Sequence, residues 1–290
     1  MAVGQAGSKE KKVVLTAENL SVTYTTKRGD VPAVRDVTFQ ICQGEALGLV
    51  GESGCGKSTT ALAAMSYLGS NGKVVGGRVT FEGQDLLGLS DAELRHIRGN
   101  RIAMVYQDPM ATLNPVLTIG DQLTEVLTTH QRSGEKQSYQ WCLDILHKVH
   151  MPDPEEVMRR YPHQISGGQQ QRVMIAMALL CKPSLLIMDE PTTALDVTVA
   201  ATVLDIVENL RTEMDLAILY ISHNLGVVAR VCDRVAVMYA GELVEQASVE
   251  DLFLRPQHPY TKSLLRCVPT LSSGKEREKP DNVTFPNLGV

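Results

Sequence analysis

Residues 51–59 constrain this chain more than any other stretch. They read Gly-Glu-Ser-Gly-Cys-Gly-Lys-Ser-Thr and fit the pattern G-x-x-x-x-G-K-[ST] of a phosphate-binding loop. The apolar run 46–50 precedes the loop, and a helical pattern over residues 59–67 follows it. A strand, a loop and a helix in this order form the context in which the pattern holds phosphate, so a chance glycine-rich turn is the weaker interpretation.

The residue types in the loop explain how it would hold a nucleotide. Its glycines let the backbone curl so that N–H groups point inward at an anion, and the following helix adds the positive end of its dipole. Lys57 is expected to reach the β- and γ-phosphates of a nucleotide, and the Ser58 hydroxyl to ligate Mg²⁺, which is a predicted cofactor. The residues predicted to bind the nucleotide here are Gly51, Ser53, Gly54, Cys55, Gly56, Lys57, Ser58 and Thr59.

Charge, hydropathy and cysteine spacing exclude several classes of protein. The 290 residues carry a formal net charge of -5, and no dense Lys/Arg block lies beyond residues 9–12, which argues against a nucleic-acid surface. The N-terminus does not resemble a signal peptide, and no window of about 18 uncharged apolar residues could span a bilayer. The six cysteines include no C-x-x-C pair, which predicts free thiols rather than zinc or iron–sulfur ligands.

Two adjacent acids follow a second apolar run. Residues 185–190 read Leu-Leu-Ile-Met-Asp-Glu, a pattern typical of a buried parallel strand. Asp189 at the end of that strand is predicted to bind Mg²⁺, and Glu190, which faces the other way, to polarise water. A simple strand-end cap would not require two carboxylates in succession.

A serine and paired glycines begin a second glycine-led helix. Residues 165–172 read Ile-Ser-Gly-Gly-Gln-Gln-Gln-Arg, and a helical run over 173–181 follows. The N–H groups of Ser166, Gly167, Gly168 and Gln169, with the helix dipole behind them, could bind an anion. Since Ser-Gly-Gly also caps many helices, an ordinary N-cap remains an open alternative.

Three single residues are weaker candidates. Gln107 follows the β-like run 101–106 and could meet Mg²⁺ or the attacking water, or could be an ordinary turn residue. His223 follows the apolar strand 217–222 and could contact a phosphate oxygen, although a surface histidine is the commoner interpretation. Tyr24 could stack on adenine, but an ordinary strand tyrosine is the simpler alternative.

The remaining chain alternates between strand and helix patterns. Residues 13–24 and 33–41 are predicted strands, residues 69–77 a glycine-rich loop, and a capping box at Ser90 predicts a helix to about residue 97. From 118 to 160 strand patterns vanish, and 3.6-residue periods predict a helical insertion in which Trp141 packs. The later predictions are helices over 197–210, 225–231, 248–254 and 258–267 and strands over 234–238 and 242–245.

Five elements therefore stand in a fixed order: the phosphate loop, Gln107, residues 166–169, Asp189-Glu190 and His223. Together they resemble the ATP-binding subunit of ABC transporters over residues 13–267, except that Ile165 stands where the family usually has leucine, a near-isosteric change. The resemblance implies an α/β fold, a P-loop NTPase (ABC ATPase) core over 13–254 with an antiparallel β subdomain and an inserted helical subdomain at about 115–170. Residues 1–12 would be a disordered leader, and 271–290 a tail without its own core.

Two further features resemble the oligopeptide/dipeptide/nickel group of importers. One is Gln107-Asp108-Pro109 with Asn114-Pro115 shortly after it, and the other is residues 256–261, Pro-Gln-His-Pro-Tyr-Thr, within an extension at 255–290. Some members of that group carry a cysteine cluster in this extension. Only Cys267 is present here, so that cluster is not expected.

The resemblance also implies a mechanism. Two subunits would close head to tail around two ATP molecules, with residues 166–169 of one facing the γ-phosphate held by the other. Glu190 would be the general base with His223 near the γ-phosphate, and Gln107 would sense Mg²⁺ and link to the helical subdomain. The implied partners are a second, identical or similar ATPase, two integral membrane permease subunits and indirectly a solute-binding protein, without nucleic acid. The implied location is peripheral, at the cytoplasmic face of the inner membrane.

The predicted function is ATP hydrolysis that energises a membrane importer, for peptides or a related small solute. The alternative is a soluble ABC-type ATPase of translation or DNA repair. Translation types usually carry two motif sets and repair types long coiled coils, and neither occurs here. A binding module without activity is opposed by intact Lys57, Asp189, Glu190 and His223, and exporters often fuse the ATPase to its membrane spans.

Overall fold

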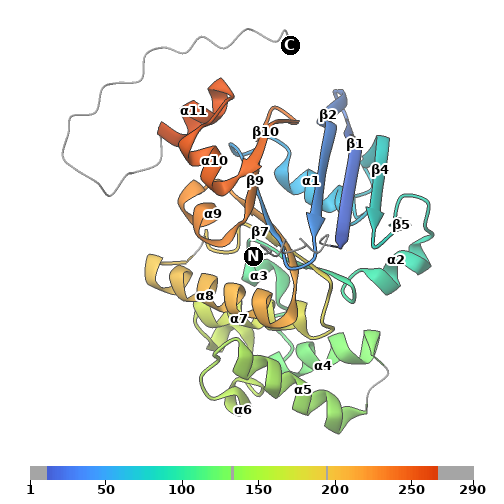
Figure 1. The fold of residues 1–290 in the computed structure, drawn as a ribbon. Coiled ribbons are helices and arrows are strands. Elements are labelled where there is room, and N and C mark those ends of the chain that lie inside the picture. The colour runs from blue at the N-terminus through green and yellow to red at the C-terminus, as the bar shows by residue number, and fades with distance from the viewer. Residues whose placement is uncertain (1–11, 132–133, 194, 267–290) are drawn as a thin grey trace, which may run out of the picture.

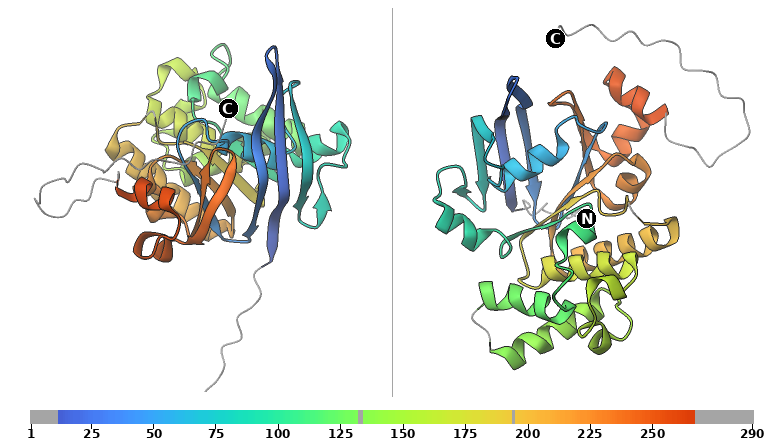
Figure 2. Two further views of the ribbon diagram at one scale, coloured as in Figure 1. Left: turned by 90° about the horizontal axis from the view of Figure 1, so that it is seen from above. Right: turned by 180° about the vertical axis from the view of Figure 1, so that it is seen from behind.

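The computed structural model describes residues 12–131, 134–193 and 195–266. Within these ranges the chain forms a six-stranded sheet in the order β10-β9-β3-β8-β7-β6 and a four-stranded sheet in the order β2-β1-β4-β5. Figure 1 shows the four-stranded sheet at one side of the molecule and a group of helices, α4 to α6, at the opposite end, and both views in Figure 2 agree. The α/β prediction is therefore confirmed.

The four-stranded sheet is antiparallel. It contains β1 (Val13–Thr26), β2 (Gly29–Cys42), β4 (Gly72–Phe81) and β5 (Gln84–Asp85). Strands β1 and β2 form a long hairpin in which Leu15 pairs with Ile41 and Tyr24 with Val31. Apolar residues of both strands, such as Leu20 and Val37, are buried.

The prediction of a loop over residues 69–77 is wrong, because most of this stretch belongs to β4. Gly72 pairs with Tyr24, and a β-carbon on Gly72 would lie 2.7 Å from the tyrosine ring. Gly77 has φ +88° next to a register shift between β1 and β4. The glycines therefore serve a close approach and a β-bulge within a strand rather than a flexible connection.

The six-stranded sheet forms the buried centre. Strands β3 (Ala46–Val50), β6 (Ile102–Val105), β7 (Leu185–Asp189), β8 (Ala217–Ser222) and β9 (Arg234–Tyr239) run parallel, and β10 (Glu242–Ser248) pairs antiparallel to β9. Every residue of β3 and β8 is buried, as expected for parallel strands covered on both faces. Because the carboxyl ends of parallel strands meet at one edge, the segments that follow β3, β6, β7 and β8 lie at the same edge.

Several helices connect the strands of the two sheets. They include α1 (Lys57–Ala64), α2 (Asp91–Ile97), α7 (Gly167–Leu179), α8 (Val197–Met214) and α9 (Leu225–Val231). Ser90 and Glu93 form the predicted capping box of α2. Asp196 caps α8 by accepting from the N–H groups of Thr198 and Val199, and α8 runs four residues beyond its predicted end at Leu210.

The helical insertion is formed by α3 (Pro109–Thr112), α4 (Ile119–His130), α5 (Glu135–Lys148), α6 (Pro154–Val157) and a 3₁₀ turn (Pro162–Gln164). Its buried leucines, such as Leu123 and Leu146, belong to the same apolar cluster as residues of α7 and of the central sheet. The insertion is therefore packed onto the central sheet through α7, and the two share one apolar cluster.

The last described helices are α10 (Val249–Leu254) and α11 (Pro259–Arg266). Ser248 caps α10, as predicted. The predicted leader lies outside the described residues except for Lys12, and so do Cys267 and the predicted tail. Within the described ranges, no helix is both long and apolar enough to cross a bilayer.

Candidate active site

The loop of residues 51–59 connects β3 to α1 and is packed from two sides. A β-carbon on Gly56 would lie 2.6 Å from the carbonyl oxygen of Ala33 in β2 and 2.7 Å from the Met238 methyl carbon in β9. Gly56 also has φ +109°, which side chains rarely tolerate. Glycine is required at this position because both the space and the backbone angle exclude a side chain.

The Lys57 side chain folds back into the loop. Its Nζ donates to the carbonyl oxygens of Gly51 and Glu52, each at 2.8 Å, and lies 3.9 Å from Cys55 Sγ. Lys57 is only 5 % exposed. Phosphate oxygens entering the loop would compete with these two carbonyl groups for the ammonium protons. Burial raises the pKa of the Cys55 thiol, although the nearby Lys57 charge opposes that rise.

Asp189 and Ser58 meet in front of the loop. Asp189 ends β7, and its carboxylate accepts a hydrogen bond from the Ser58 hydroxyl. Burial raises the Asp189 pKa, while the hydrogen bond and Lys57 offset part of the rise and Glu190 adds to it. A carboxylate and a hydroxyl oxygen are ligands that suit Mg²⁺. No group of three or more His, Cys, Asp or Glu side chains in the described ranges could hold a metal, so Mg²⁺ would also need ligands of other types.

Glu190 is held in an unusual orientation. Its φ of +48° is rare for a residue with a side chain, and its N–H donates to the Ile221 carbonyl oxygen at 3.0 Å. Its Oε2 accepts a hydrogen bond from Thr193 Oγ1 at 3.1 Å and lies 3.1 Å from His223 Nδ1. The Glu190 side chain is 16 % exposed and the His223 side chain 55 %. A mostly buried carboxylate with two defined neighbours suits a group that accepts a proton from water.

Sequence reasoning did not assign a role to Thr193. Its position three residues after Glu190, in a turn closed by a hydrogen bond from its N–H to the Glu190 carbonyl oxygen, is the signal that could have identified it. His223, in contrast, was predicted at this edge, and the structure places it beside Glu190.

Gln107 lies just beyond β6 at the same edge of the sheet. Its side chain is exposed and forms no hydrogen bond within the described part of the chain. The preceding residue, Tyr106, lies near Tyr67 and Asp189. Burial raises the pKa of Tyr106, and these two neighbours add to that rise. The next residue, Asp108, caps α3. Gln107 therefore lies between Asp189 and the start of the helical insertion.

Residues 166–169 form the start of α7, as the N-cap interpretation expected. The Ser166 N–H donates to Gln169 Oε1 at 2.9 Å, and the Gln169 N–H donates to Ser166 Oγ at 3.3 Å. A β-carbon on Gly168 would lie 2.6 Å from Val199 Cγ1 of α8. Within the described residues, no hydrogen bond or ion pair joins this segment to the phosphate loop of the same chain.

Tyr24 lies on β1 opposite Val31 and Gly72, and its half-buried ring packs against the core beneath the antiparallel sheet. Val31 is two residues from Ala33, which contacts the phosphate loop. Tyr24 is therefore near the loop, and stacking on a base remains a prediction.

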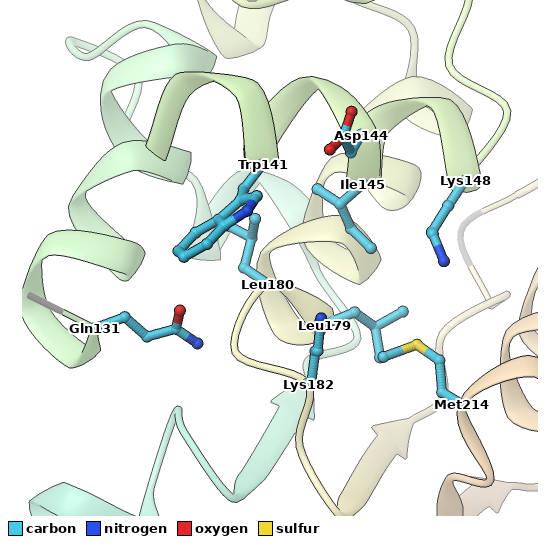
Figure 3. Close-up of a pocket in the computed structure, with 9 residues that line it drawn as sticks. All are labelled: Gln131, Trp141, Asp144, Ile145, Lys148, Leu179, Leu180, Lys182 and Met214. Atoms are coloured by element: carbon cyan, nitrogen blue, oxygen red, sulfur yellow. The ribbon is translucent and has the colours of Figure 1, made fainter. Parts of the chain in front are cut away.

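A cavity of about 340 Å³ lies in the helical part of the molecule (Figure 3). Trp141 lines it with Lys182 and Met214, and the tryptophan is 37 % exposed. The expectation that Trp141 packs inside the insertion is therefore wrong, because one side of its ring faces this cavity.

Comparison with known proteins decides the family. A family model described as ABC transporter matches residues 34–193, which include the phosphate loop, Gln107, residues 166–169 and Glu190. The chain belongs to the ABC transporter family. A second model, described as the C-terminal region of oligopeptide/dipeptide transporters, matches residues 244–288.

Relatives of known name share most of this ABC protein's length. It is 49% identical over 276 residues to the dipeptide transport ATP-binding protein DppD of Bacillus subtilis, covering 95% of this chain and 82% of that protein. It is 49% identical over 261 residues to the oligopeptide transport ATP-binding protein OppD of Salmonella typhimurium, covering 90% and 78%. The prediction of an ATPase of the ABC type is confirmed.

Solved structures show the same fold. A dimeric post-hydrolysis state of the ATP-binding cassette MJ0796, bound to ADP and Pi, matches with a TM-score of 0.72 and 26% identity, covering 81% of this ABC protein and 98% of that chain. The structure of cbiO1 from Clostridium perfringens, part of the ABC transporter complex cbiONQ, also gives a TM-score of 0.72, at 25% identity and with 84% and 92% covered. The predicted ABC ATPase fold is confirmed.

Proposed function

We propose that this chain hydrolyses ATP to energise a membrane importer for peptides or a related small solute. The observation that carries the proposal is the arrangement at one sheet edge, where a phosphate loop, the Asp189–Ser58 pair and the oriented Glu190 lie together. The match of residues 244–288 to the C-terminal region of oligopeptide/dipeptide transporters and the names DppD and OppD support peptides as the cargo.

The phosphate loop binds the nucleotide. Backbone N–H groups of the loop and the N-terminus of α1 hold the phosphates, and Lys57 exchanges its two carbonyl partners for β- and γ-phosphate oxygens. Ser58, Asp189 and Gln107 would hold Mg²⁺, which would neutralise charge on the phosphates. Tyr24 covers the base from β1.

Glu190 acts as the general base toward the attacking water. Thr193 and His223 fix the direction of its carboxylate, and the second ring nitrogen of His223 would contact the γ-phosphate. Since phosphoryl transfer requires mainly positioning and electrostatic stabilisation, a fixed carboxylate serves this chemistry without further covalent groups.

A second subunit completes each site. The N–H groups at the start of α7 in one subunit face the γ-phosphate held by the loop of the other, with Ser166, Gly167, Gly168 and Gln169 contributing. The missing bond between this segment and the loop of its own chain supports that arrangement, and so does the dimeric form of the MJ0796 cassette. Binding of ATP closes the dimer and hydrolysis reopens it.

The membrane subunits dock in a groove at the helical insertion. Met104, Val126, His130 and Met177 line it between β6, α4 and α7. Its apolar lining and its position after the Mg²⁺-sensing Gln107 fit a short helix of a permease subunit. Two permease subunits, a second ATPase and, through them, a solute-binding protein are the partners, and the chain is peripheral at the cytoplasmic face of the inner membrane.

Purification of the chain from its native membrane in mild detergent, followed by mass spectrometry, tests this function. Two multi-span proteins and a second ATPase are expected, and the binding protein associated with them would identify the cargo. Val126→Glu places a charge in the groove and should release the membrane proteins, while Val75→Glu on the exposed face of β4 should not. Recovery with ribosomes or nucleic acid in place of membrane proteins would favour the soluble alternative.

A further inference from the structure

The C-terminal helix α11 contacts the phosphate loop. The Glu52 N–H donates a hydrogen bond to the hydroxyl oxygen of Tyr260, 208 positions later in the chain, at 3.1 Å. Figure 1 shows α10 and α11 beside β9 and β10, and the rear view in Figure 2 agrees. Tyr260 is 3 % exposed, so the contact is buried. A segment outside the matched range 34–193 therefore reaches the nucleotide site.

The peptide between Gly51 and Glu52 joins this helix to the loop lysine. Its N–H, from Glu52, donates to Tyr260, and its carbonyl oxygen, from Gly51, accepts from Lys57 Nζ at 2.8 Å. Further along the loop, the Cys55 carbonyl oxygen accepts from the Gly241 N–H in the turn between β9 and β10, at 3.0 Å. Two peptides of the loop are thus held by the C-terminal third of the chain.

The ring of Tyr260 is itself fixed. It packs on the ring of Tyr239 at the end of β9, with the ring centroids 4.5 Å apart and the planes at 44°. Burial is the largest cause of the raised pKa of Tyr260, which keeps its phenol neutral. A neutral phenol oxygen still accepts a hydrogen bond from a backbone N–H. The position of this hydroxyl is therefore defined by the strand on which the ring rests.

The start of α11 is anchored on β10. The Glu245 carboxylate accepts hydrogen bonds from the N–H groups of Gln257, at 2.7 Å, and His258, at 2.9 Å. Burial alone would raise the Glu245 pKa, but these bonds and the Thr261 side chain lower it below its ordinary value. Because a carboxylate at a helix N-terminus is stabilised by the exposed N–H groups, Glu245 holds α11 in place behind the loop.

We propose that Tyr260 is a positioning residue for the phosphate-binding loop. Its hydroxyl fixes the peptide between Gly51 and Glu52. It thereby also fixes the position of the Lys57 ammonium before phosphate binds. The inference rests on the proposed nucleotide-binding function and extends it, because it gives the C-terminal region a direct effect on the ATP site. By linkage, nucleotide in the loop and the position of α11 influence each other to the same extent.

Tyr260→Phe tests the proposal, since it removes the hydroxyl and keeps the ring on Tyr239. The control is Tyr139→Phe, which removes an exposed hydroxyl from α5. The affinity of the purified full chain for a fluorescent ATP analogue is measured by titration. Loss of one hydrogen bond to a loop peptide predicts binding about threefold to tenfold weaker in Tyr260→Phe and unchanged in Tyr139→Phe.

A second readout reports on the loop without nucleotide. Cys55 in the loop and Cys232 after α9 are each 8 % exposed, so their rates of alkylation by iodoacetamide, followed by mass spectrometry, form a matched pair. Tyr260→Phe should speed alkylation of Cys55 several-fold, because a loosened loop opens more often, and should leave Cys232 unchanged.

Unchanged affinity together with an unchanged Cys55 rate would overturn the proposal. Faster alkylation of both cysteines, with a lower unfolding temperature, would also overturn it, because Tyr260 would then only stabilise the fold. If the wild-type chain bound no nucleotide, the proposed function would fail, and the comparison of Cys55 with Cys232 would still decide whether Tyr260 positions the loop.

Discussion

Removing the Thr193 hydroxyl should slow ATP hydrolysis without weakening ATP binding. Thr193 Oγ1 donates to Glu190 Oε2 at 3.1 Å, and His223 Nδ1 is the other neighbour of that oxygen. A hydrogen bond to a charged group contributes about 1.5–3 kcal/mol. Because Thr193 is exposed, water replaces part of the lost bond, and a net loss of about 1 kcal/mol in the transition state corresponds to about a fivefold lower kcat.

The assay is phosphate release at saturating ATP, with the KM for ATP measured in parallel. Thr193→Val keeps the shape of the side chain and removes the donor, whereas Thr193→Ser keeps the donor and should retain most of the turnover. Thr198→Val is the control, since the Thr198 hydroxyl is exposed and forms no hydrogen bond in the described part of the chain. The reasoning is refuted if Thr193→Val hydrolyses ATP at the wild-type rate, or if Thr198→Val loses as much.

Three further predictions concern binding and stability. Lys57→Ala should weaken ATP binding at least about tenfold in a nucleotide titration, because the phosphates lose a charged donor, and unchanged affinity would oppose the loop assignment. Asp189→Asn should raise the unfolding temperature near neutral pH. Because the pKa of the folded carboxyl is raised, the unfolded chain loses this proton more readily, and the folded state loses stability as the pH rises. The gain from the substitution should vanish as the pH falls below about 4, the ordinary pKa of aspartate. Gly168→Ala should cost about 1–3 kcal/mol in denaturant unfolding through its clash with Val199, and Val199→Ala should recover part of it.

The main parts of the site follow from local sequence patterns. The phosphate loop, Asp189 and His223 each follow a short apolar run that reads as a buried parallel strand, and parallel strands bring their carboxyl ends to one edge. The N-caps at Ser90, Ser166 and Asp196 were likewise predictable from residue type. Each of these features is determined by the residues next to it in the sequence, which is why local patterns predict it.

Long-range packing was not predictable in this way. Sequence patterns predicted the strand over residues 78–81, but residues 72–77 join it because β1 offers a pairing edge and a place for Gly72 against Tyr24, neither of which appears in the local sequence. The contact between Tyr260 and Glu52 depends on how α11 packs behind the loop. Trp141 reads as a core residue from its helical period, yet the neighbouring helices leave a cavity beside it.

The most direct test of the account is the rate of ATP hydrolysis by Glu190→Gln at saturating ATP, in preparations shown to bind ATP. The amide keeps the size of the side chain and its contact with Thr193, but it cannot accept a proton from water. A general base contributes about 10²–10⁴-fold to a reaction rate, so turnover should fall by at least about a hundredfold while ATP affinity is kept. Hydrolysis at the wild-type rate would contradict the assignment of Glu190 and, with it, the proposed use of this sheet edge in catalysis.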